Sequence, residues 1–342
     1  MDMEKSPFEK SIAHGKDKRK CAIIGEKQTR RKGMDFTHCT LCPRRCGADR
    51  TTGRGRCGMG EEIMLARAAL HTGEEPCISG KNGSGAVFFS GCVLGCVFCQ
   101  NAEISQKHYG KAVSAERLSE IFLELQAQGA HNINLVSAAQ FAPQAAKALE
   151  KAKPKLKIPV VYNTGGYESC ETLKAMEGLV DVYLPDLKYK DAALSRAYSG
   201  AADYFEVASR AVCEMYRQVG PVRLDENGMM TRGVLVRHLL LPGCRKDAMA
   251  VIDFLCQALP ADKILFSLMS QYTPCYKAVG DKKIGRRVTT FEAESVREYA
   301  VSRGLSGFSQ DRSAATGEYI PAFDLTGVTR QGKTSGGQNG AE

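Results

Sequence analysis

Long apolar runs are missing from this 342-residue sequence, and their absence excludes several classes of protein. No run reaches the roughly 18 apolar residues that a membrane-spanning helix needs. The charged N-terminus also lacks the apolar stretch of a secretory signal peptide. We therefore expect a cytoplasmic protein with no membrane partner. A chain of this length forms one large domain or two ordinary ones.

Aromatic residues are scarce at the N-terminus, and basic residues outnumber acidic ones there, since residues 1–35 carry ten Lys and Arg against six acids. Phe8 is the only aromatic residue there, so a surface for stacking nucleic-acid bases is lacking. We predict a basic disordered extension over residues 1–35 and expect no nucleic-acid partner. Residues 327–342 are rich in Gly, Ser and Gln with little to bury, which predicts a disordered tail.

Cysteine, in contrast, is abundant, with fourteen residues. Clustered cysteines in a cytoplasmic protein more often bind metals than form disulfides. Seven of them fall into two tight clusters, one within a predicted cysteine-rich unit over residues 36–75 and one after residue 90. We interpret the seven scattered ones as small residues of the core.

From residue 80 to 326, short apolar runs alternate with helical patterns, which predicts an α/β fold with a parallel sheet. Six β-then-α units in a row indicate a partial (β/α)6 barrel, in which ligands collect at the C-terminal ends of the strands. The predicted strands are Ala86–Ser90, Ile133–Val136, Pro159–Tyr162, Val180–Leu184, Val234–Leu240 and Ile264–Ser267. The predicted helices are one after Ser114, Ala142–Lys153, Ser169–Met176, Ala202–Val219, Lys246–Leu259, and one that begins with the capping-box pair Thr289 and Glu292.

The second cysteine cluster consists of Cys92, Cys96 and Cys99, spaced C-x3-C-x2-C at the end of the first predicted strand. A structural zinc site takes four ligands, whereas this cluster has three and no fourth cysteine close by. Three thiolates on an iron–sulfur cubane leave one iron open for another ligand. The spacing therefore predicts a [4Fe–4S] cluster with one open iron.

This motif resembles the signature of the radical S-adenosylmethionine (SAM) superfamily. Four further segments resemble its pyruvate formate-lyase activating-enzyme-like branch, and the N-terminal cysteines and Ser267–Pro274 suit a subgroup of that branch. The four segments are Gly91–Gln106, Tyr162–Tyr167, Tyr183–Lys188 and Val236–Gly243.

The resemblance implies an oxidoreductase that works without oxygen. Its cluster binds SAM and cleaves it to methionine and a 5′-deoxyadenosyl radical, which abstracts a hydrogen atom. It further implies an electron donor such as flavodoxin or ferredoxin. The substrate of such an activating enzyme is a backbone glycine of a glycyl-radical enzyme such as pyruvate formate-lyase.

Residues that would bind SAM follow from the same resemblance. Asp186 and Lys188 match an Asp-x-Lys motif at the end of the fourth predicted strand. Asn163 ends the third strand, within reach of ribose hydroxyls, and Gly165 would permit close backbone approach. His238 lies on the fifth strand and is a further candidate for contact with SAM.

One position departs from the superfamily pattern. Many members have Gly-Gly-Glu after the second strand to hold the SAM amino group, whereas this chain has Ser137, two alanines and Gln140. Ser137 or Gln140 can accept a hydrogen bond from that ammonium group, although more weakly than a carboxylate.

The first cysteine cluster supplies four thiols within nineteen residues: Cys39, Cys42, Cys46 and Cys57. Four ligands fill the coordination shell of zinc or of a cubane alike, so the spacing leaves zinc, an iron–sulfur cluster and unmetallated thiols open.

Three functions therefore compete at this point. The first is a radical SAM enzyme that activates a glycyl-radical enzyme, and the second is one that acts on a small molecule or peptide. The third is a zinc-binding protein associated with nucleic acid through its basic arm.

Overall fold

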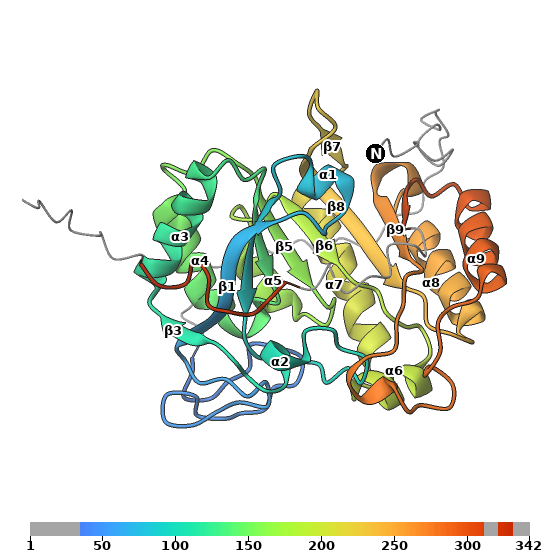
Figure 1. Cartoon of the computed structure of the whole chain (residues 1–342), viewed down its shortest axis with the longest axis horizontal. Helices are drawn as coiled ribbons and strands as arrows, with labels where there is room; N and C mark the ends of the chain where they lie inside the picture. The colour runs from blue at the N-terminus through green and yellow to red at the C-terminus, as the bar shows by residue number, and fades with distance from the viewer. Residues whose placement is uncertain (1–34, 311–320, 331–342) are drawn as a thin grey trace, which may run out of the picture.

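The computed structural model describes residues 35–310 and 321–330 and has a curved sheet at its centre (Figure 1). The predicted extension over 1–35 lies outside the described residues except for Asp35. The strands are β1 (Ile63–His71), β2 (Ser84–Phe89), β3 (Lys111–Val113), β4 (Ile133–Val136), β5 (Val160–Thr164), β6 (Val182–Pro185), β7 (Arg223–Leu224), β8 (Met230–Leu239), β9 (Leu265–Met269) and β10 (Gly307–Gln310).

The core of the sheet is parallel. Its order is β10-β9-β8-β6-β5-β4-β2-β1-β3, and the pairings from β2 through to β10 are parallel, whereas β1 is antiparallel to both of its neighbours. Strands β2, β4, β5 and β6 are buried along their whole length, as expected where both faces are covered. The predicted partial (β/α)6 barrel is confirmed, and each of its six predicted strands overlaps an observed one.

Helices cover the outer face of this sheet (Figure 1). Ser114 caps α3 through Arg117 N–H, and Thr289 and Glu292 form the predicted capping box of α9. The helix predicted from Ala202 begins at Tyr204, after its N-cap residue Asp203, and a separate short helix over Ala192–Ser199 precedes it. The helices are α1 (Pro76–Ser79), α2 (Ala102–Ser105), α3 (Ala115–Ala127), α4 (Ala142–Ala152), α5 (Cys170–Ala175), α6 (Ala192–Ser199), α7 (Tyr204–Val219), α8 (Arg245–Ala258) and α9 (Thr290–Ser302).

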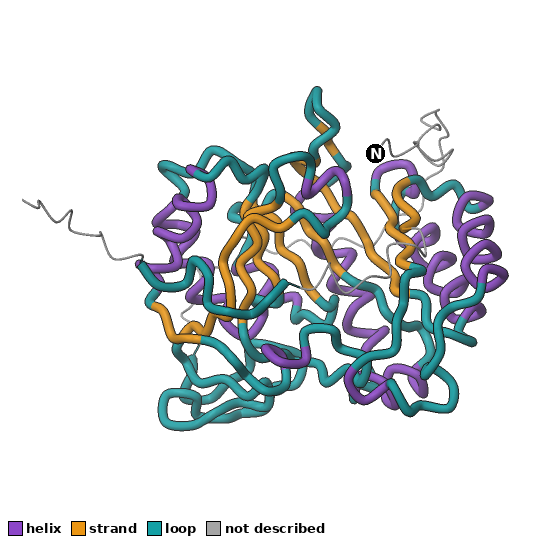
Figure 2. Tube along the Cα trace, in the orientation of Figure 1, coloured by secondary structure: helices purple, strands orange, loops and turns teal. Residues whose placement is uncertain are grey.

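The short helix α1 packs into the N-terminal end of the barrel. Cys77 and Ile78 of α1 belong to a buried apolar cluster with Val161, Val182 and Leu235 from three barrel strands. In Figure 1, α1 and β7 lie at the top, and the parallel strands run away from them. Figure 2 shows loops gathered at the opposite end. That end carries the C-terminal ends of the strands, where sequence analysis places the site.

Strand β1 extends the sheet from within residues 36–75, where sequence analysis expects only a cysteine-rich unit. A register irregularity between Leu65 and Arg67 interrupts the alternation of side chains between the two faces of the strand. The sequence therefore gives no clear strand pattern here. The segment after residue 321 covers part of its edge, since Leu325 N–H donates to Ala66 and Ala68 N–H donates to Thr326.

The prediction of a disordered tail over residues 327–342 is wrong for its first four residues. Gly327–Arg330 are described, Val328 is fully buried, and its carbonyl accepts from Arg117 Nε at 3.1 Å. Residues 331–342 lie outside the described residues. Within the described ranges, no helix is long and apolar enough to cross a membrane.

Candidate functional site

The cluster loop, residues 90–101, follows β2 at the C-terminal edge of the sheet. Backbone hydrogen bonds fix its start, because Ser90 N–H donates to Met64 and Gly91 N–H donates to Ile104. The three thiols of the motif each have a polar neighbour. Cys96 Sγ lies 2.9 Å from Ser199 Oγ, Cys99 Sγ lies 3.2 Å from Ser105 Oγ, and Cys92 Sγ accepts from Leu94 N–H.

The electrostatics of these thiols fit metal ligands. Burial raises the pKa of Cys92 to about 12, and burial also raises the pKa values of Cys96 and Cys99. The Lys188 ammonium opposes the rise at all three. Protonated, buried thiols are poor nucleophiles, whereas coordination to a metal deprotonates a thiol outright. Three such thiols beside one cation therefore fit an iron–sulfur cluster better than disulfide chemistry.

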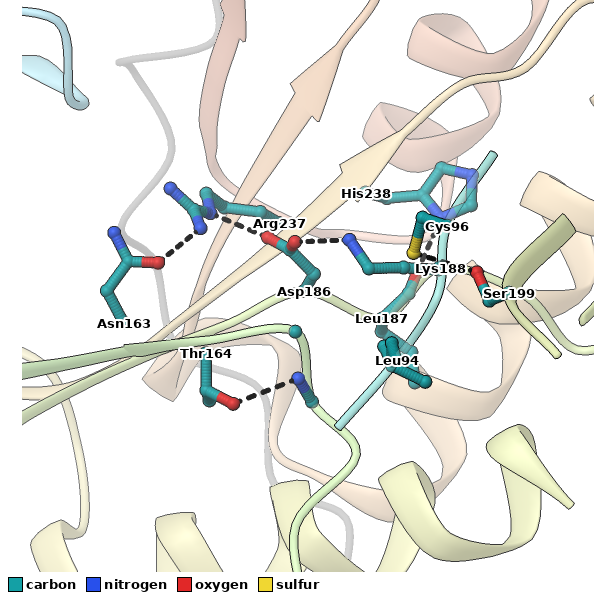
Figure 3. A network of polar contacts seen from close by, with 12 residues as sticks. Leu94, Cys96, Asn163, Thr164, Asp186, Leu187, Lys188, Ser199, Arg237 and His238 are labelled. Atoms are coloured by element: carbon teal, nitrogen blue, oxygen red, sulfur yellow. Dashed lines mark hydrogen bonds and ion pairs between the residues drawn. The ribbon is translucent and has the colours of Figure 1, made fainter. Parts of the chain in front are cut away.

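A network of buried charges lies next to the cluster loop (Figure 3). Asp186, just after β6, accepts from Lys188 Nζ at 2.5 Å and from Arg237 Nε at 2.9 Å. Burial alone would raise the pKa of Asp186, but the two cations outweigh it and hold the pKa below its ordinary value. The predicted pair is therefore an ion pair in the barrel, and its Lys188 is close enough to the three cysteines to affect their pKa values.

Arg237 of β8 extends this network toward the N-terminal end of the barrel. Its guanidinium donates to Asn163 Oδ1 at 2.6 Å and to Glu74 Oε2 at 2.9 Å. Glu74 Oε1 accepts in turn from Asn163 Nδ2 at 2.9 Å and from Asn134 Nδ2 at 3.1 Å. Both polar ends of the Asn163 side chain are thus occupied by protein groups. Its contact with a ribose stays a prediction.

His238 is a buried neutral histidine. Burial lowers its pKa to about 4, and its Nδ1 lies 2.7 Å from the Leu187 carbonyl oxygen. A carbonyl oxygen only accepts, so Nδ1 carries the proton and Nε2 presents a lone pair. The Asp186 and Lys188 side chains are close enough to affect this pKa. The chain thus supplies a hydrogen-bond acceptor next to the ion pair of Asp186 and Lys188.

The two glycines after β5 permit close approach between protein segments. A Cβ on Gly165 would lie 3.2 Å from Leu94 of the cluster loop, and a Cβ on Gly166 would overlap the Asp186 carbonyl oxygen. Gly166 also has a positive φ of 80°. These glycines therefore bring the Asp186 segment and the cluster loop together.

Replacing Gly166 with Ala should destabilise the protein strongly. The left-handed backbone alone costs an L-residue about 1–2 kcal/mol, and overlap with the Asp186 carbonyl adds about 1–3 kcal/mol. Gly200 is the matched control, since its φ is 63° and no atom lies within 4 Å of an added Cβ. Urea unfolding should show a larger loss for Gly166→Ala than for Gly200→Ala. Equal losses would mean that the contact with Asp186 relaxes freely.

Ser137 and Gln140 occupy the position of the missing acidic motif. Ser137 has a positive φ of 61°, and its N–H donates to the Asn163 carbonyl. Gln140 is 2% exposed, and its amide nitrogen donates to the carbonyls of Ser90, Gly91 and Ser137. Gln140 therefore anchors the cluster loop. Contact between SAM and either side chain stays a prediction.

The four N-terminal cysteines come from a separate segment that contacts the cluster loop, since Arg44 Nε donates to the Val93 carbonyl at 3.0 Å. Cys39, Cys42 and Cys57 are buried and Cys46 is exposed. Among the residues that the structure describes, no three Cys, His, Asp or Glu side chains are close enough to hold a single metal ion.

Sequence reasoning missed Glu74 and the positioning roles of Arg237 and Ser199. Glu74 lies in the loop before α1, and no local pattern links it to β8, 163 residues later. Arg237 lies beside His238, but a lone strand arginine gives no sign of its three partners. A charged residue directly after the apolar run Val234–Val236 was the available signal.

The chain is 30% identical over 283 residues to an uncharacterised protein of Methanocaldococcus jannaschii, across 79% of this chain and 76% of that protein. Residues 86–211 match the family model of the radical SAM superfamily. The chain belongs to the radical SAM superfamily. This membership implies a [4Fe–4S] cluster and SAM, and it favours an enzyme over a zinc protein associated with nucleic acid.

Solved structures show partial likeness to this radical SAM enzyme. Streptococcus suis SuiB bound to its precursor peptide SuiA aligns with a TM-score of 0.45 and 14% identity, over 64% of this chain and 46% of SuiB. A domain of pyruvate-formate lyase-activating enzyme from Bacteroides vulgatus aligns with a TM-score of 0.37 and 13% identity, over 50% of this chain and 91% of that domain. The chain spans about half the length of SuiB.

Proposed function

We propose that this radical SAM enzyme removes a hydrogen atom from a backbone glycine of a partner protein and so activates a glycyl-radical enzyme such as pyruvate formate-lyase. The observation that carries the proposal is the ion pair of Asp186 and Lys188 beside the cluster loop. In sequence, this pair resembles the Asp-x-Lys motif of activating enzymes.

In this proposal, Cys92, Cys96 and Cys99 hold the cluster. When bound, the cluster supplies the electron that cleaves SAM to methionine and a 5′-deoxyadenosyl radical. The chain's own residues bind and orient SAM. Asp186 can accept from its ammonium group, Lys188 can donate to its carboxylate, and the neutral His238 offers an acceptor at Nε2.

We further propose an acidic one-electron donor such as flavodoxin or ferredoxin. Residues 276–287 include the exposed Lys277, Lys282, Lys283 and Arg287. The same segment packs on the cluster loop, because Lys277 N–H donates to the Val97 carbonyl at 2.9 Å. A basic surface next to the cluster complements an acidic donor and speeds its encounter.

Electron paramagnetic resonance tests the glycyl-radical proposal directly. The reconstituted protein, SAM and dithionite are incubated anaerobically with pyruvate formate-lyase, with Cys96→Ala as the inactive control. We expect a glycyl-radical signal in the lyase and a matching amount of 5′-deoxyadenosine. Formation of 5′-deoxyadenosine at an unchanged rate, with no radical in the lyase, contradicts the proposal and favours a small-molecule or peptide substrate.

Replacing Asp186 with Asn should weaken SAM binding about tenfold or more, since a charge-assisted hydrogen bond contributes about 1.5–3 kcal/mol. Iron content should stay at the wild-type level, because Asp186 is no thiolate ligand. Asp324→Asn, at a surface carboxylate paired with Arg67, is the matched control. Equilibrium binding of SAM and iron analysis check this. Unchanged SAM affinity at full iron loading would reduce Asp186 to a structural partner of Arg237.

A further inference from the structure

The four N-terminal cysteines lie in a segment with no helix or strand over the described residues 35–62. Backbone bonds turn this segment around them, because Cys39 N–H donates to Ala48, Gly47 N–H donates to Cys39, and Arg45 N–H donates to Cys42. Arg45 and Gly47 both have positive φ. A short segment with so little regular structure and so small a core commonly depends on a bound metal.

The four thiols lie close to one another. Cys42 is close enough to Cys39 and Cys57 for their charges to interact, and Cys57 is equally close to Cys39 and Cys46. The Cys46 thiol also has a hydrogen bond with the Cys39 side chain. Each of the four thiols is therefore near at least two of the others.

A buried cation lies beside these thiols. Arg50 is 1% exposed, and its NH1 lies 3.7 Å from Cys39 Sγ. Its other hydrogen bonds go to the backbone carbonyls of Met59, Gly60 and Gln140. No carboxylate pairs with Arg50 among the residues that the structure describes. A buried guanidinium needs a counter-charge, and four metal-bound thiolates carry one.

Direct contacts link the four-cysteine segment to the cluster loop. A Cβ on Gly91, which immediately precedes Cys92, would lie 2.8 Å from the Cys57 carbonyl oxygen. Arg44, between Cys42 and Cys46, donates from Nε to the Val93 carbonyl at 3.0 Å. Any group held by the four cysteines therefore lies against the backbone that carries Cys92.

The spacing and the separation of the thiols together favour an iron–sulfur cluster over zinc. Zinc sites typically use two separated pairs of ligands, whereas ferredoxin-type clusters use a compact run of three cysteines and a distant fourth. Cys39, Cys42 and Cys46 form such a run, and Cys57 is the distant fourth. Zinc–sulfur bonds of about 2.3 Å would also bring the sulfurs to about 3.8 Å from one another. Among the described residues, no three thiols lie close enough together to hold a single metal ion.

We propose that Cys39, Cys42, Cys46 and Cys57 bind a second [4Fe–4S] cluster in contact with the loop of the first, with Arg50 as its buried counter-charge. The proposal concerns a separate site and does not depend on the identity of the substrate.

Metal analysis of the anaerobically reconstituted full chain tests this. The wild type should bind about eight irons with matching sulfide and no zinc, since each [4Fe–4S] cluster holds four. Cys42→Ser should bind about four irons. Cys256→Ser is the control, because Cys256 lies on α8 with its Sγ near the Arg303 carbonyl, and it should keep about eight.

A second variant keeps the test valid even where Cys42→Ser does not fold. Cys96→Ser removes a ligand of the first cluster, so the iron that stays bound reports on the second. About four irons in this variant support the proposal. No iron in Cys96→Ser, or one zinc and about four irons in the wild type, would overturn it.

Discussion

The Cys96→Ala variant should lose about four irons and all cleavage of SAM. The cluster needs all three thiolates of the cluster loop, and Cys96 is the most buried of them, against Ser199. The fold should survive, because the barrel core consists of aliphatic and aromatic side chains from strands and helices. Iron analysis, 5′-deoxyadenosine assay and circular dichroism measure the three effects.

Cys275→Ala is the control for this variant. Cys275 is close enough to Cys99 to affect its pKa, but its Sγ donates to the Phe98 carbonyl at 3.2 Å. It lies outside the C-x3-C-x2-C motif, so its removal should leave iron content and SAM cleavage intact. Wild-type cleavage by Cys96→Ala, or loss of the cluster in Cys275→Ala, would contradict the assignment of the three ligands.

The Arg237→Met variant should lose about 3–5 kcal/mol of unfolding free energy, the usual cost of breaking a buried ion pair from one side. Its guanidinium holds Asp186, Glu74 and Asn163, and Met would leave the two carboxylates without this partner in the barrel. Urea unfolding of the reconstituted protein measures the loss.

Arg67→Met is the matched control. Arg67 pairs at the surface with Asp324, where ion pairs contribute about 0–1 kcal/mol. A similar small loss in both variants would show that the buried network contributes little to stability.

Much of the fold could be predicted because its signals are local. The six barrel strands follow from short apolar runs, and the starts of α3 and α9 follow from Ser114 and Thr289. Strand β1 was missed because its register irregularity interrupts the pattern. The helix α6 was missed because only eight residues carry its pattern.

The candidate site likewise has one part with a local sequence signal and another part that depends on contacts between distant residues. The spacing of Cys92, Cys96 and Cys99 is a local signal with chemical meaning, and it pointed to the correct superfamily. The contacts of Glu74 with Arg237 and of Arg50 with Gln140 join residues 163 and 90 positions apart. Such contacts arise only when the barrel closes around α1 and the N-terminal segment packs on it.

Cleavage of SAM by the wild-type chain is the most direct test of the central claim. The protein is reconstituted with iron and sulfide and then incubated anaerobically with SAM and dithionite. The account predicts 5′-deoxyadenosine and methionine in equal amounts, with none formed by Cys96→Ala. A wild-type protein that carries its full iron and sulfide but forms no 5′-deoxyadenosine would contradict the account.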